Sequence, residues 1–250
     1  MKYIVLTMAE TRMAEPDHDV FGPGYRIIEF PMIRTEPLEI PPDIFSTALK
    51  ADWLLFTSQN AVWYFLDNLE KEVPASKITK PSLAAIGHST SDLLVSNGLK
   101  VRFIPTRSNR VILSQELPVL SGQKVSVFTS EQTNRSEYEA ILQKGASLHF
   151  NFLYRTLPIE HDKQEWDKVI ELRPSAFCFL SSSAVTSFFN QLKSCEIRLQ
   201  PDNFTWGAIG PVTARELMKW IAEPIIQPES STLNSLLQAI WKTTVTVQGD

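Results

Sequence analysis

The residues of this chain best suited to bind an anion lie in four short turns, each of which follows a predicted strand. The turns are rich in hydroxyl side chains and glycine: Ser58, Gly87–Thr90, Ser181–Ser183 and Gly210–Thr213. Each turn opens a helix-type pattern, where the first N–H groups of the helix have no partner within it. Such N–H groups bind phosphate and carboxylate groups in many α/β proteins. Ordinary capping, worth about 1 kcal/mol per helix, is the alternative interpretation.

The four turns belong to an internal repeat. Ile86–Gly87 matches Ile209–Gly210 at an offset of 123 residues (209 − 86 = 123), and the same offset aligns FTSQNAV with FLSSSAV. Self-similarity at one constant spacing indicates that one supersecondary plan is used twice. Repetition makes capping alone a weaker explanation of the turns, although it does not exclude it.

Strand and helix patterns alternate through both halves of the chain. Predicted strands such as Trp53–Thr57 and Ala176–Leu180 are apolar throughout or nearly so, as in parallel sheets that helices cover on both faces. The second half lacks counterparts of the predicted strands Lys124–Thr129 and Ser147–Tyr154. The N-terminal segment contains similar sequences, KYIVLT and EFPMIRT, so we expect it to supply the missing strands.

These patterns predict an α/β protein of two similar domains, each a parallel sheet flanked by helices, joined by a two-stranded ladder. Domain one is expected to be discontinuous, residues 1–35 plus 157–250, with domain two, residues 36–156, inserted into it. Arg34–Pro42, which holds three prolines, is predicted to be a linker that crosses between the domains. Val111–Leu120 is predicted to be helical.

Composition and charge limit the class of protein. The chain of 250 residues has a net charge of −4 and a pI near 5.7, which does not favour nucleic acid as a partner. The N-terminal run MKYIVLT is too short for a membrane span and unlike a signal peptide. We therefore predict a cytoplasmic protein that contacts neither nucleic acid nor membrane.

No cofactor or metal is expected. The chain has no G-x-G-x-x-G motif and no phosphate-binding loop, and its two cysteines, Cys178 and Cys195, lack metal-ligand spacing. Its four histidines are scattered, and we expect surface or packing roles for them: His18, His88, His149 and His161.

One segment is basic although the protein as a whole is acidic. Between Asp92 and Glu116 the chain has no acidic residue and four basic ones: Lys100, Arg102, Arg107 and Arg110. A local patch of this kind attracts anions. A solvated basic face is the alternative interpretation.

Tyr154, in the predicted strand NFLYRT, is the remaining candidate for chemistry. It lies at a predicted crossing between the two domains. A tyrosine at a strand end usually packs, with its hydroxyl bonded to water or backbone. From the residues alone both a packing and a catalytic role stay open.

In order and spacing these landmarks resemble the uroporphyrinogen-III synthase family over nearly the whole chain. The similar stretches are FTSQNAV, AAIGHST, SEQTNR, LYRT, FLSSSAV, AIGPVTAREL and PESSTLNSLLQAI. The most specific signal is AIGPVTA followed by the Pro-Glu…Thr-Leu…Leu segment. The chain departs from the family at its first strand, which usually ends in Thr-Arg-Pro but here continues Thr7-Met8-Ala9, with Arg12 as a possible substitute.

The resemblance implies a lyase of heme biosynthesis, with two α/β domains and a cleft between them. Its substrate would be hydroxymethylbilane, a small molecule with eight carboxylates, converted to uroporphyrinogen III with loss of water and inversion of the last ring. It implies no cofactor, and we expect a monomer. By match, Tyr154 is the general acid that helps the hydroxyl leave. The substrate-binding residues would be Ser58, Gly87, Thr90, Arg135, Ser181, Ser182, Gly210 and Thr213.

Two other classes of protein remain as alternatives. One is a non-catalytic two-domain binding protein for an anionic tetrapyrrole or a sugar-like ligand. It would leave only the uninverted isomer, which the bilane forms without help. The other is a two-domain glycosyl- or phosphoryl-transfer enzyme, but the chain lacks the acidic pairs or phosphate loops of such chemistry.

Overall fold

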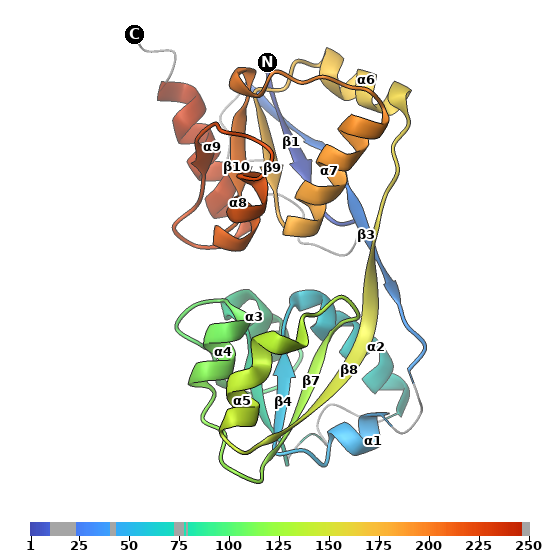
Figure 1. The fold of residues 1–250 in the computed structure, drawn as a ribbon, viewed down its shortest axis with the longest axis vertical. Coiled ribbons are helices and arrows are strands. Elements are labelled where there is room, and N and C mark those ends of the chain that lie inside the picture. The colour runs from blue at the N-terminus through green and yellow to red at the C-terminus, as the bar shows by residue number, and fades with distance from the viewer. Residues whose placement is uncertain (11–23, 41–43, 73–77, 79, 247–250) are drawn as a thin grey trace. The chain divides into compact units, whose positions relative to one another are not determined.

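The computed structural model describes residues 1–10, 24–40, 44–72, 78 and 80–246 (Figure 1). The chain divides into two compact units. Unit 1 consists of Met1–Thr35 and Leu157–Asp250, and unit 2 consists of Glu36–Thr156. Among the described residues, no helix is both long enough and apolar enough to span a membrane.

The sheet of unit 2 has six strands. In spatial order they are β3 (Ile33–Pro37), β8 (Ser147–Pro158), β7 (Lys124–Ser130), β4 (Trp53–Phe56), β5 (Ser82–Ala85) and β6 (Val101–Phe103). From β8 to β6 each neighbouring pair is parallel. All four residues of β4 are buried, which explains why this strand reads as a continuous apolar run.

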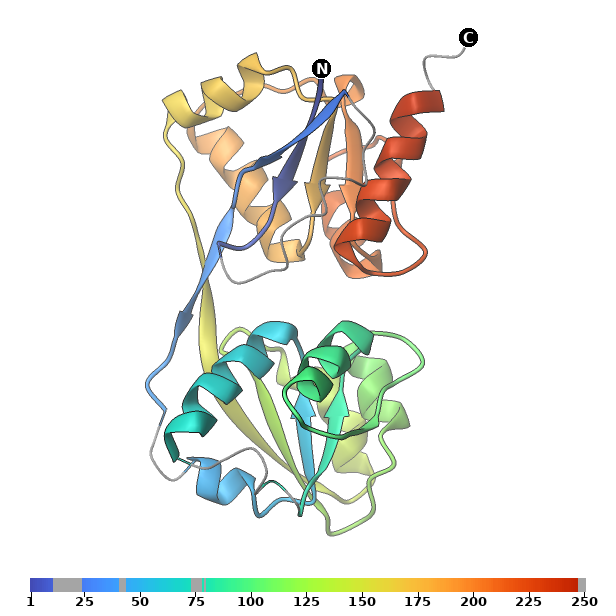
Figure 2. The same cartoon turned by 180° about the vertical axis from the view of Figure 1, so that it is seen from behind.

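Helices cover both faces of this sheet, and Figures 1 and 2 show the layers from opposite sides. Side chains alternate along β4, as they must in a strand. Leu54 and Phe56 pack with α1 (Ile44–Ala48), α2 (Gln59–Glu72) and α3 (His88–Ser96). Trp53 and Leu55 pack with α4 (Arg110–Glu116), the 3₁₀ helix η3 (Arg135–Tyr138) and α5 (Glu139–Gln143).

The sheet of unit 1 has five strands, all paired in parallel. In spatial order they are β11 (Ile225–Ile226), β10 (Thr205–Ala208), β9 (Ala176–Phe179), β1 (Lys2–Thr7) and β2 (Tyr25–Glu29). One face packs against α6 (Lys163–Glu171), α7 (Ser182–Ser194) and α8 (Pro211–Leu217). The other packs against α9 (Leu233–Thr246). A short 3₁₀ helix, η4 (Pro201–Asn203), precedes β10.

The two sheets repeat one plan, and the predicted α/β fold with parallel sheets is confirmed. In unit 1, β9 lies between β10 and β1, just as β4 lies between β5 and β7 in unit 2. The strand β1 (KYIVLT) therefore takes the place of β7 (KVSVFT), as the sequence predicted. Strand β3 is hydrogen-bonded to β8, and the chain passes from one unit to the other within these two strands.

Three sequence predictions need correction. The segment Arg34–Pro42 is not a plain linker, because its first half belongs to β3. The segment EFPMIRT does not form one strand: it contributes Glu29 to β2 and its last three residues, from Ile33, to β3. Helix α4 ends at Glu116 rather than Leu120, because Leu117 precedes a proline and leaves the helical region with ψ of 123°.

Candidate functional site

The structure brings together two predicted site residues of unit 2, Ser58 and Tyr154. Ser58 follows β4, and its Oγ accepts a hydrogen bond of 3.0 Å from the Ala61 N–H, which caps α2. The same Oγ lies 3.0 Å from the Tyr154 hydroxyl oxygen. The Tyr154 ring stacks on Tyr64 of α2, with ring centroids 5.2 Å apart. Residues 96 positions apart in sequence thus form one hydroxyl pair.

An irregularity in the pairing of β8 with β7 directs the Tyr154 side chain toward Ser58. The register between β7 and β8 shifts between Thr129 and Ser130, so that Phe152 and Tyr154 face consecutive residues of β7. As a result Leu153 and Tyr154, which are adjacent in sequence, pack in the same cluster with α2. Bulges of this kind re-aim side chains and are frequent beside active sites.

The environment keeps the Tyr154 phenol neutral. Burial raises its pKa, because an ionised phenol would lose its solvation, while hydrogen bonds from Ser58 and Ser130 and the charge of Arg110 oppose that effect. Tyr64 raises the pKa slightly further. A phenol that starts near pKa 10 and is shifted upward carries its proton at neutral pH. It can therefore act as a proton donor.

More hydroxyl groups lie at the ends of β4 and β7. The Thr57 hydroxyl donates a hydrogen bond of 2.8 Å to Thr129 Oγ1, which is in turn bonded to Thr133. The Tyr138 side chain is fully buried, and burial raises the pKa of its hydroxyl. Sequence reasoning missed this cluster. A signal was present, since the sequence Phe-Thr-Ser begins at Phe56, the last residue of β4, and again at Phe128 of β7, and the two phenylalanines are in register.

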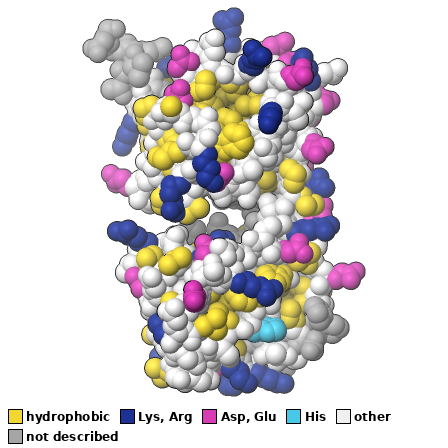
Figure 3. All heavy atoms as spheres, viewed as in Figure 1, with side chains coloured by type: hydrophobic (Ala, Val, Ile, Leu, Met, Phe, Trp, Pro, Cys, Tyr) yellow, Lys and Arg dark blue, Asp and Glu magenta, His cyan; other side chains and the backbone are white. Residues whose placement is uncertain are grey.

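The four basic residues between Asp92 and Glu116 differ in their environment. Lys100, Arg102 and Arg107 are exposed, whereas Arg110 opens α4 and pairs with Glu137 at 3.3 Å. In Figure 3, acidic and basic side chains are interspersed on the visible face of unit 2. Of the four basic residues, Arg110 alone contributes to the charge felt by the Tyr154 phenol.

Gly87 and Thr90 lie in the turn that begins α3. Gly87 is the N-cap, with an extended backbone (φ −170°) that any residue could adopt. Glycine is needed there for space, because a Cβ would overlap the Ser108 hydroxyl and lie 3.1 Å from Ser108 Cβ. Gln59, just after Ser58, donates a hydrogen bond of 3.3 Å to the Ser89 carbonyl. This bond ties the Gly87–Thr90 turn to the Ser58 turn.

Unit 1 repeats this arrangement. Ser181 caps α7 by accepting a bond of 3.1 Å from the Ala184 N–H, and Ser182 is the first residue of that helix. Gly210 is the N-cap of α8, and a Cβ on it would lie 3.1 Å from Ser231 Oγ. These turns follow β9 and β10, which are neighbours, so they share one edge of the sheet.

The threonines of the two glycine turns are more buried than a binding role alone suggests. Thr90 is 4% exposed, and its repeat counterpart Thr213 is 5% exposed. Each is the third residue of its helix, α3 or α8. Their side chains therefore pack within their own units, and little of their surface faces solvent.

Arg135 is placed by aromatic contacts. It is exposed, and its guanidinium carbon lies 5.5 Å from the ring centre of Phe150 and 5.2 Å from that of Phe152. Both rings belong to β8. Cation–π contacts of this kind hold a guanidinium without neutralising its charge.

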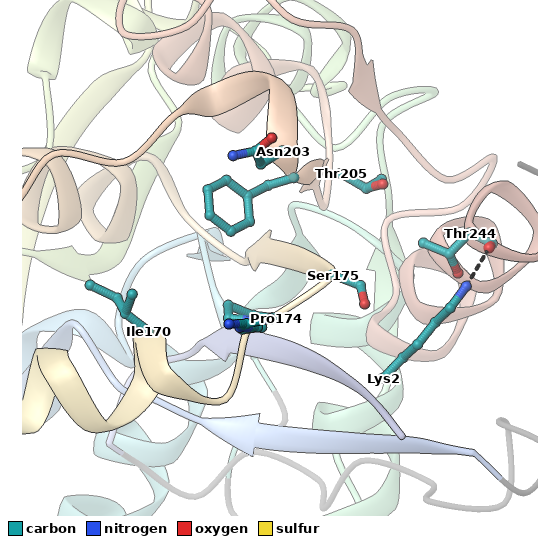
Figure 4. Close-up of a pocket in the computed structure, with 9 residues that line it drawn as sticks. Lys2, Ile170, Pro174, Ser175, Asn203, Thr205 and Thr244 are labelled. Carbon is teal, nitrogen blue, oxygen red and sulfur yellow. Dashed lines mark hydrogen bonds between the residues drawn. The ribbon is translucent and has the colours of Figure 1, made fainter.

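A pocket in unit 1 is lined by none of the predicted site residues of that unit. It has a volume of about 540 Å³ and is lined by Lys2, Pro174, Ser175 and Thr205, among others (Figure 4). These residues stand at or just before the amino ends of β1, β9 and β10. The predicted site residues of unit 1 follow the opposite, carboxyl ends, so none of them lines this pocket.

The described residues contain no group of three or more histidines, cysteines or carboxylates that could hold a metal ion. His161 packs on Phe30, with ring centroids 3.9 Å apart, and its Nε2 lies 2.7 Å from the Pro31 carbonyl oxygen. His88 and His149 are exposed. His18 and Arg12 lie outside the described residues.

Comparison with known proteins gives consistent matches over the length of the chain. The family model described as uroporphyrinogen-III synthase HemD matches residues 22–238. The uroporphyrinogen-III synthase of Chlorobaculum parvum is 24% identical, with 96% of this chain and 98% of that protein covered. The one of Synechococcus elongatus is 23% identical, with 96% and 94% covered.

Solved structures share the fold. A mutant uroporphyrinogen III synthase of Thermus thermophilus aligns with a TM-score of 0.66 at 17% identity, covering 99% of this chain and 100% of that one. The Helicobacter pylori protein aligns with a TM-score of 0.64 at 21% identity and the same coverage. At 17% and 21% identity, these two structural matches show a shared fold and nothing more. The family model, however, covers well over half of the sequence, and the chain therefore belongs to the uroporphyrinogen-III synthase family.

Proposed function

We propose that this protein is a lyase that closes hydroxymethylbilane to uroporphyrinogen III, with loss of water and inversion of the last pyrrole ring. Family membership supports the reaction, and it favours an enzyme over the binding-protein alternative. The Ser58–Tyr154 pair is the observation that carries the proposal within this chain. It supplies a buried, neutral proton donor at the carboxyl end of a parallel sheet, where α/β proteins commonly bind ligands.

In the proposed mechanism Tyr154 is the general acid. Its proton passes to the hydroxyl group of the bilane, the C–O bond breaks and water leaves. The substrate becomes an electrophilic methylene-pyrrole cation and Tyr154 a phenolate. The last ring then attacks through its substituted α-carbon to give a spiro intermediate, which rearranges to the inverted ring. The proton that the product releases on becoming aromatic can return to the phenolate, so the protein ends unchanged.

We also propose that the hydroxyl and glycine turns bind substrate carboxylates. A protein of net charge −4 does not attract an anion by its overall charge, so local donors are required. The proposed residues in unit 2 are Ser58, Gly87, Thr90 and Arg135. Their counterparts in unit 1 are Ser181, Ser182, Gly210 and Thr213. Since Thr90 and Thr213 are nearly buried, we assign them mainly to holding the shape of their turns.

The test is Tyr154→Phe in the full-length protein, assayed for the isomer of the product. Loss of a general acid typically slows a reaction about 10²–10⁴-fold, so the variant should form the type III isomer slowly while the spontaneous type I isomer accumulates. Tyr64→Phe, which keeps the ring that stacks on Tyr154, is the matched control and should stay fast. Full activity of Tyr154→Phe would refute the role of Tyr154. Only type I product from the unaltered protein would refute the function itself.

The proposal also covers the domain bounds, the oligomeric state, the location in the cell and the absence of a cofactor. We propose that the two domains are residues 1–35 with 157–250 and residues 36–156, and that the protein works as a monomer in the cytoplasm without a cofactor. The separation of the chain into two compact units supports the domain division. Light scattering of the purified protein, activity after exhaustive dialysis against a chelator, and cell fractionation test the other features.

A further inference from the structure

We propose that Gln132 is a positioning residue for the reaction, and that its side-chain amide fixes the stretch of β8 that carries Tyr154. The inference rests on the proposed function, because it concerns how the proposed general acid is held in place. In the stretch SEQTNR, Arg135 was the residue expected to bind substrate. Gln132, in the same stretch, makes contacts to the backbone of β8 that its local sequence does not indicate.

The strand β8 extends beyond the end of the strand beside it. β7 ends at Ser130, opposite Tyr154, whereas β8 continues to Pro158, and Figure 1 shows the two strands side by side. The pairing is also irregular here, because the register shifts between Thr129 and Ser130. Such a shift disrupts the ladder locally. The backbone of β8 around Tyr154 therefore depends on other contacts to fix it.

The turn that follows β7 supplies these contacts. The Glu131 N–H donates a hydrogen bond of 2.8 Å to the Tyr154 carbonyl oxygen. Gln132 is bonded to Thr156 twice. Its Oε1 accepts a bond of 3.1 Å from the Thr156 N–H, and its Nε2 donates one of 3.2 Å to the Thr156 carbonyl oxygen. A neighbouring strand would offer the same two kinds of group, an acceptor and a donor, so the side-chain amide of Gln132 continues the ladder where β7 has ended.

Buried hydroxyl groups hold the same turn from its inner side. The Thr133 hydroxyl is bonded to Thr129 Oγ1, which also accepts a bond of 2.8 Å from the Thr57 hydroxyl. All three threonines are buried. Thr57 directly precedes Ser58 in the sequence. The turn that holds the backbone of Tyr154 is therefore also joined to the segment that carries its hydroxyl partner.

The proposed reaction step depends on the position that these contacts set. Tyr154 donates its proton from a hydroxyl that lies 3.0 Å from Ser58 Oγ, and its ring stacks on Tyr64. A general acid must lie within hydrogen-bond reach of the atom that it protonates, and a displacement of about 1 Å can cost about 10²-fold in rate. Loosening β8 just after the register shift would permit such a displacement.

A purely structural role for Gln132 makes different predictions. Gln132 is exposed, and substitutions at exposed positions usually change the free energy of unfolding little. If its two bonds served stability alone, removing them would lower the urea midpoint and leave kcat of the folded protein unchanged. If they position Tyr154, removing them should lower kcat with little change in stability, and only while the Tyr154 hydroxyl is present.

The chain offers a matched control for this substitution. Gln132→Ala removes both bonds to Thr156. Gln123→Ala also removes a bond between a glutamine side chain and the backbone, because Gln123 Oε1 accepts one of 2.9 Å from the Leu120 N–H. Gln123, however, directly precedes β7, whereas Gln132 follows its other end.

The experiment measures kcat and KM of the full-length variants for hydroxymethylbilane, with the type III isomer as the product scored. Gln132→Ala should lower kcat about tenfold, with KM within about threefold. Gln123→Ala should remain near the rate of the unaltered protein. When Gln132→Ala is added to Tyr154→Phe, the remaining rate should change less than about twofold, because two changes that act through one group are not additive.

Amide hydrogen exchange, followed by NMR, gives a readout that needs no activity. The Thr156 N–H is bonded to Gln132 Oε1, so it should exchange about tenfold or more faster in Gln132→Ala than in the unaltered protein. Gln123→Ala should leave its exchange unchanged.

Several results would overturn the inference. Full kcat in Gln132→Ala would do so, as would an equal loss in Gln123→Ala or an additive loss in the double variant with Tyr154→Phe. Unchanged exchange of the Thr156 N–H would show that Gln132 does not fix this backbone. Failure of the unaltered protein to make type III product would instead refute the proposed function, and the exchange of Thr156 would still test the contact.

Discussion

Ser58 and Tyr154 share one hydrogen bond, yet replacing each residue should have a different main effect. Ser58→Ala should lower the free energy of unfolding more than Tyr154→Phe, whereas Tyr154→Phe should lower the catalytic rate more. Ser58→Ala removes an N-cap, which costs about 1 kcal/mol. It also leaves the Tyr154 hydroxyl without its 3.0 Å partner in a side chain only 6% exposed, which costs about 1–3 kcal/mol. We therefore expect a total loss of about 2–4 kcal/mol in the free energy of unfolding.

Tyr154→Phe should cost less stability and far more activity. Ser58 keeps its bond to the Ala61 N–H, and the ring keeps its stacking on Tyr64, so only neutral hydrogen bonds of the lost hydroxyl are removed, about 1 kcal/mol each. In the isomer assay the order reverses. Tyr154→Phe loses the proton donor and about 10²–10⁴-fold in rate, whereas Ser58→Ala keeps the donor and should lose about tenfold or less.

Ser181→Ala is the matched control for stability. Ser181 caps α7 with a bond of 3.1 Å, as Ser58 caps α2 with one of 3.0 Å, and the structure pairs the Ser58 hydroxyl, in addition, with a tyrosine. Urea-induced unfolding, followed by circular dichroism, should show Ser58→Ala to be more destabilising by about 1–3 kcal/mol. Equal losses in the two serine variants would refute the energetic importance of the hydroxyl pair. A rate for Ser58→Ala as low as that of Tyr154→Phe would refute the division of roles.

Three further outcomes are expected. Gly87→Ala should lower the free energy of unfolding by about 1–3 kcal/mol, because its methyl group would overlap Ser108. Gly210→Ala meets only a hydroxyl oxygen, at 3.1 Å, and should cost less than about 1 kcal/mol; equal losses in urea unfolding would contradict the packing argument. Iodoacetamide should modify Cys195 before Cys178 in the native protein, because burial raises the pKa of the Cys178 thiol to about 12 and the thiolate is the reactive form; peptide mass spectrometry locates the label. The same shift should make stability fall as pH rises above the ordinary thiol pKa of 9.0, since the unfolded thiol then loses its proton while the folded one keeps it; a Cys178→Ala variant with an unchanged pH slope would count against this cause.

The regular elements could be predicted from the sequence because their signals are local. The strand Trp53–Phe56 is apolar at every position since both faces of a parallel sheet are covered. Ser58 could be assigned as a cap because a hydroxyl before a helix satisfies an N–H three residues on. The similarity of KYIVLT to KVSVFT also predicted that β1 stands for β7, as the sheet order confirms.

Elements whose ends depend on a neighbour were predicted less well. Most of the strand β3 was expected to be a linker, because the three prolines of Arg34–Pro42 indicate irregular chain and the hydrogen-bonded partner of β3, β8, is distant in sequence. The end of α4 could have been predicted, since Pro118 follows Leu117 directly. The strand β3 depends on its pairing with a distant segment, which the local sequence does not encode. The end of α4, by contrast, depends on a local signal.

The sequence by itself determined the fold class, the double use of one supersecondary plan, and the family to which the turns and Tyr154 point. Only the tertiary structure decided the surroundings of Tyr154. Its contact with Ser58 depends on a register shift between β7 and β8, and its raised pKa depends first on its burial. Hydrogen bonds and charges act through distance in space. That distance is set by strand register and helix packing, which no local pattern around Tyr154 encodes.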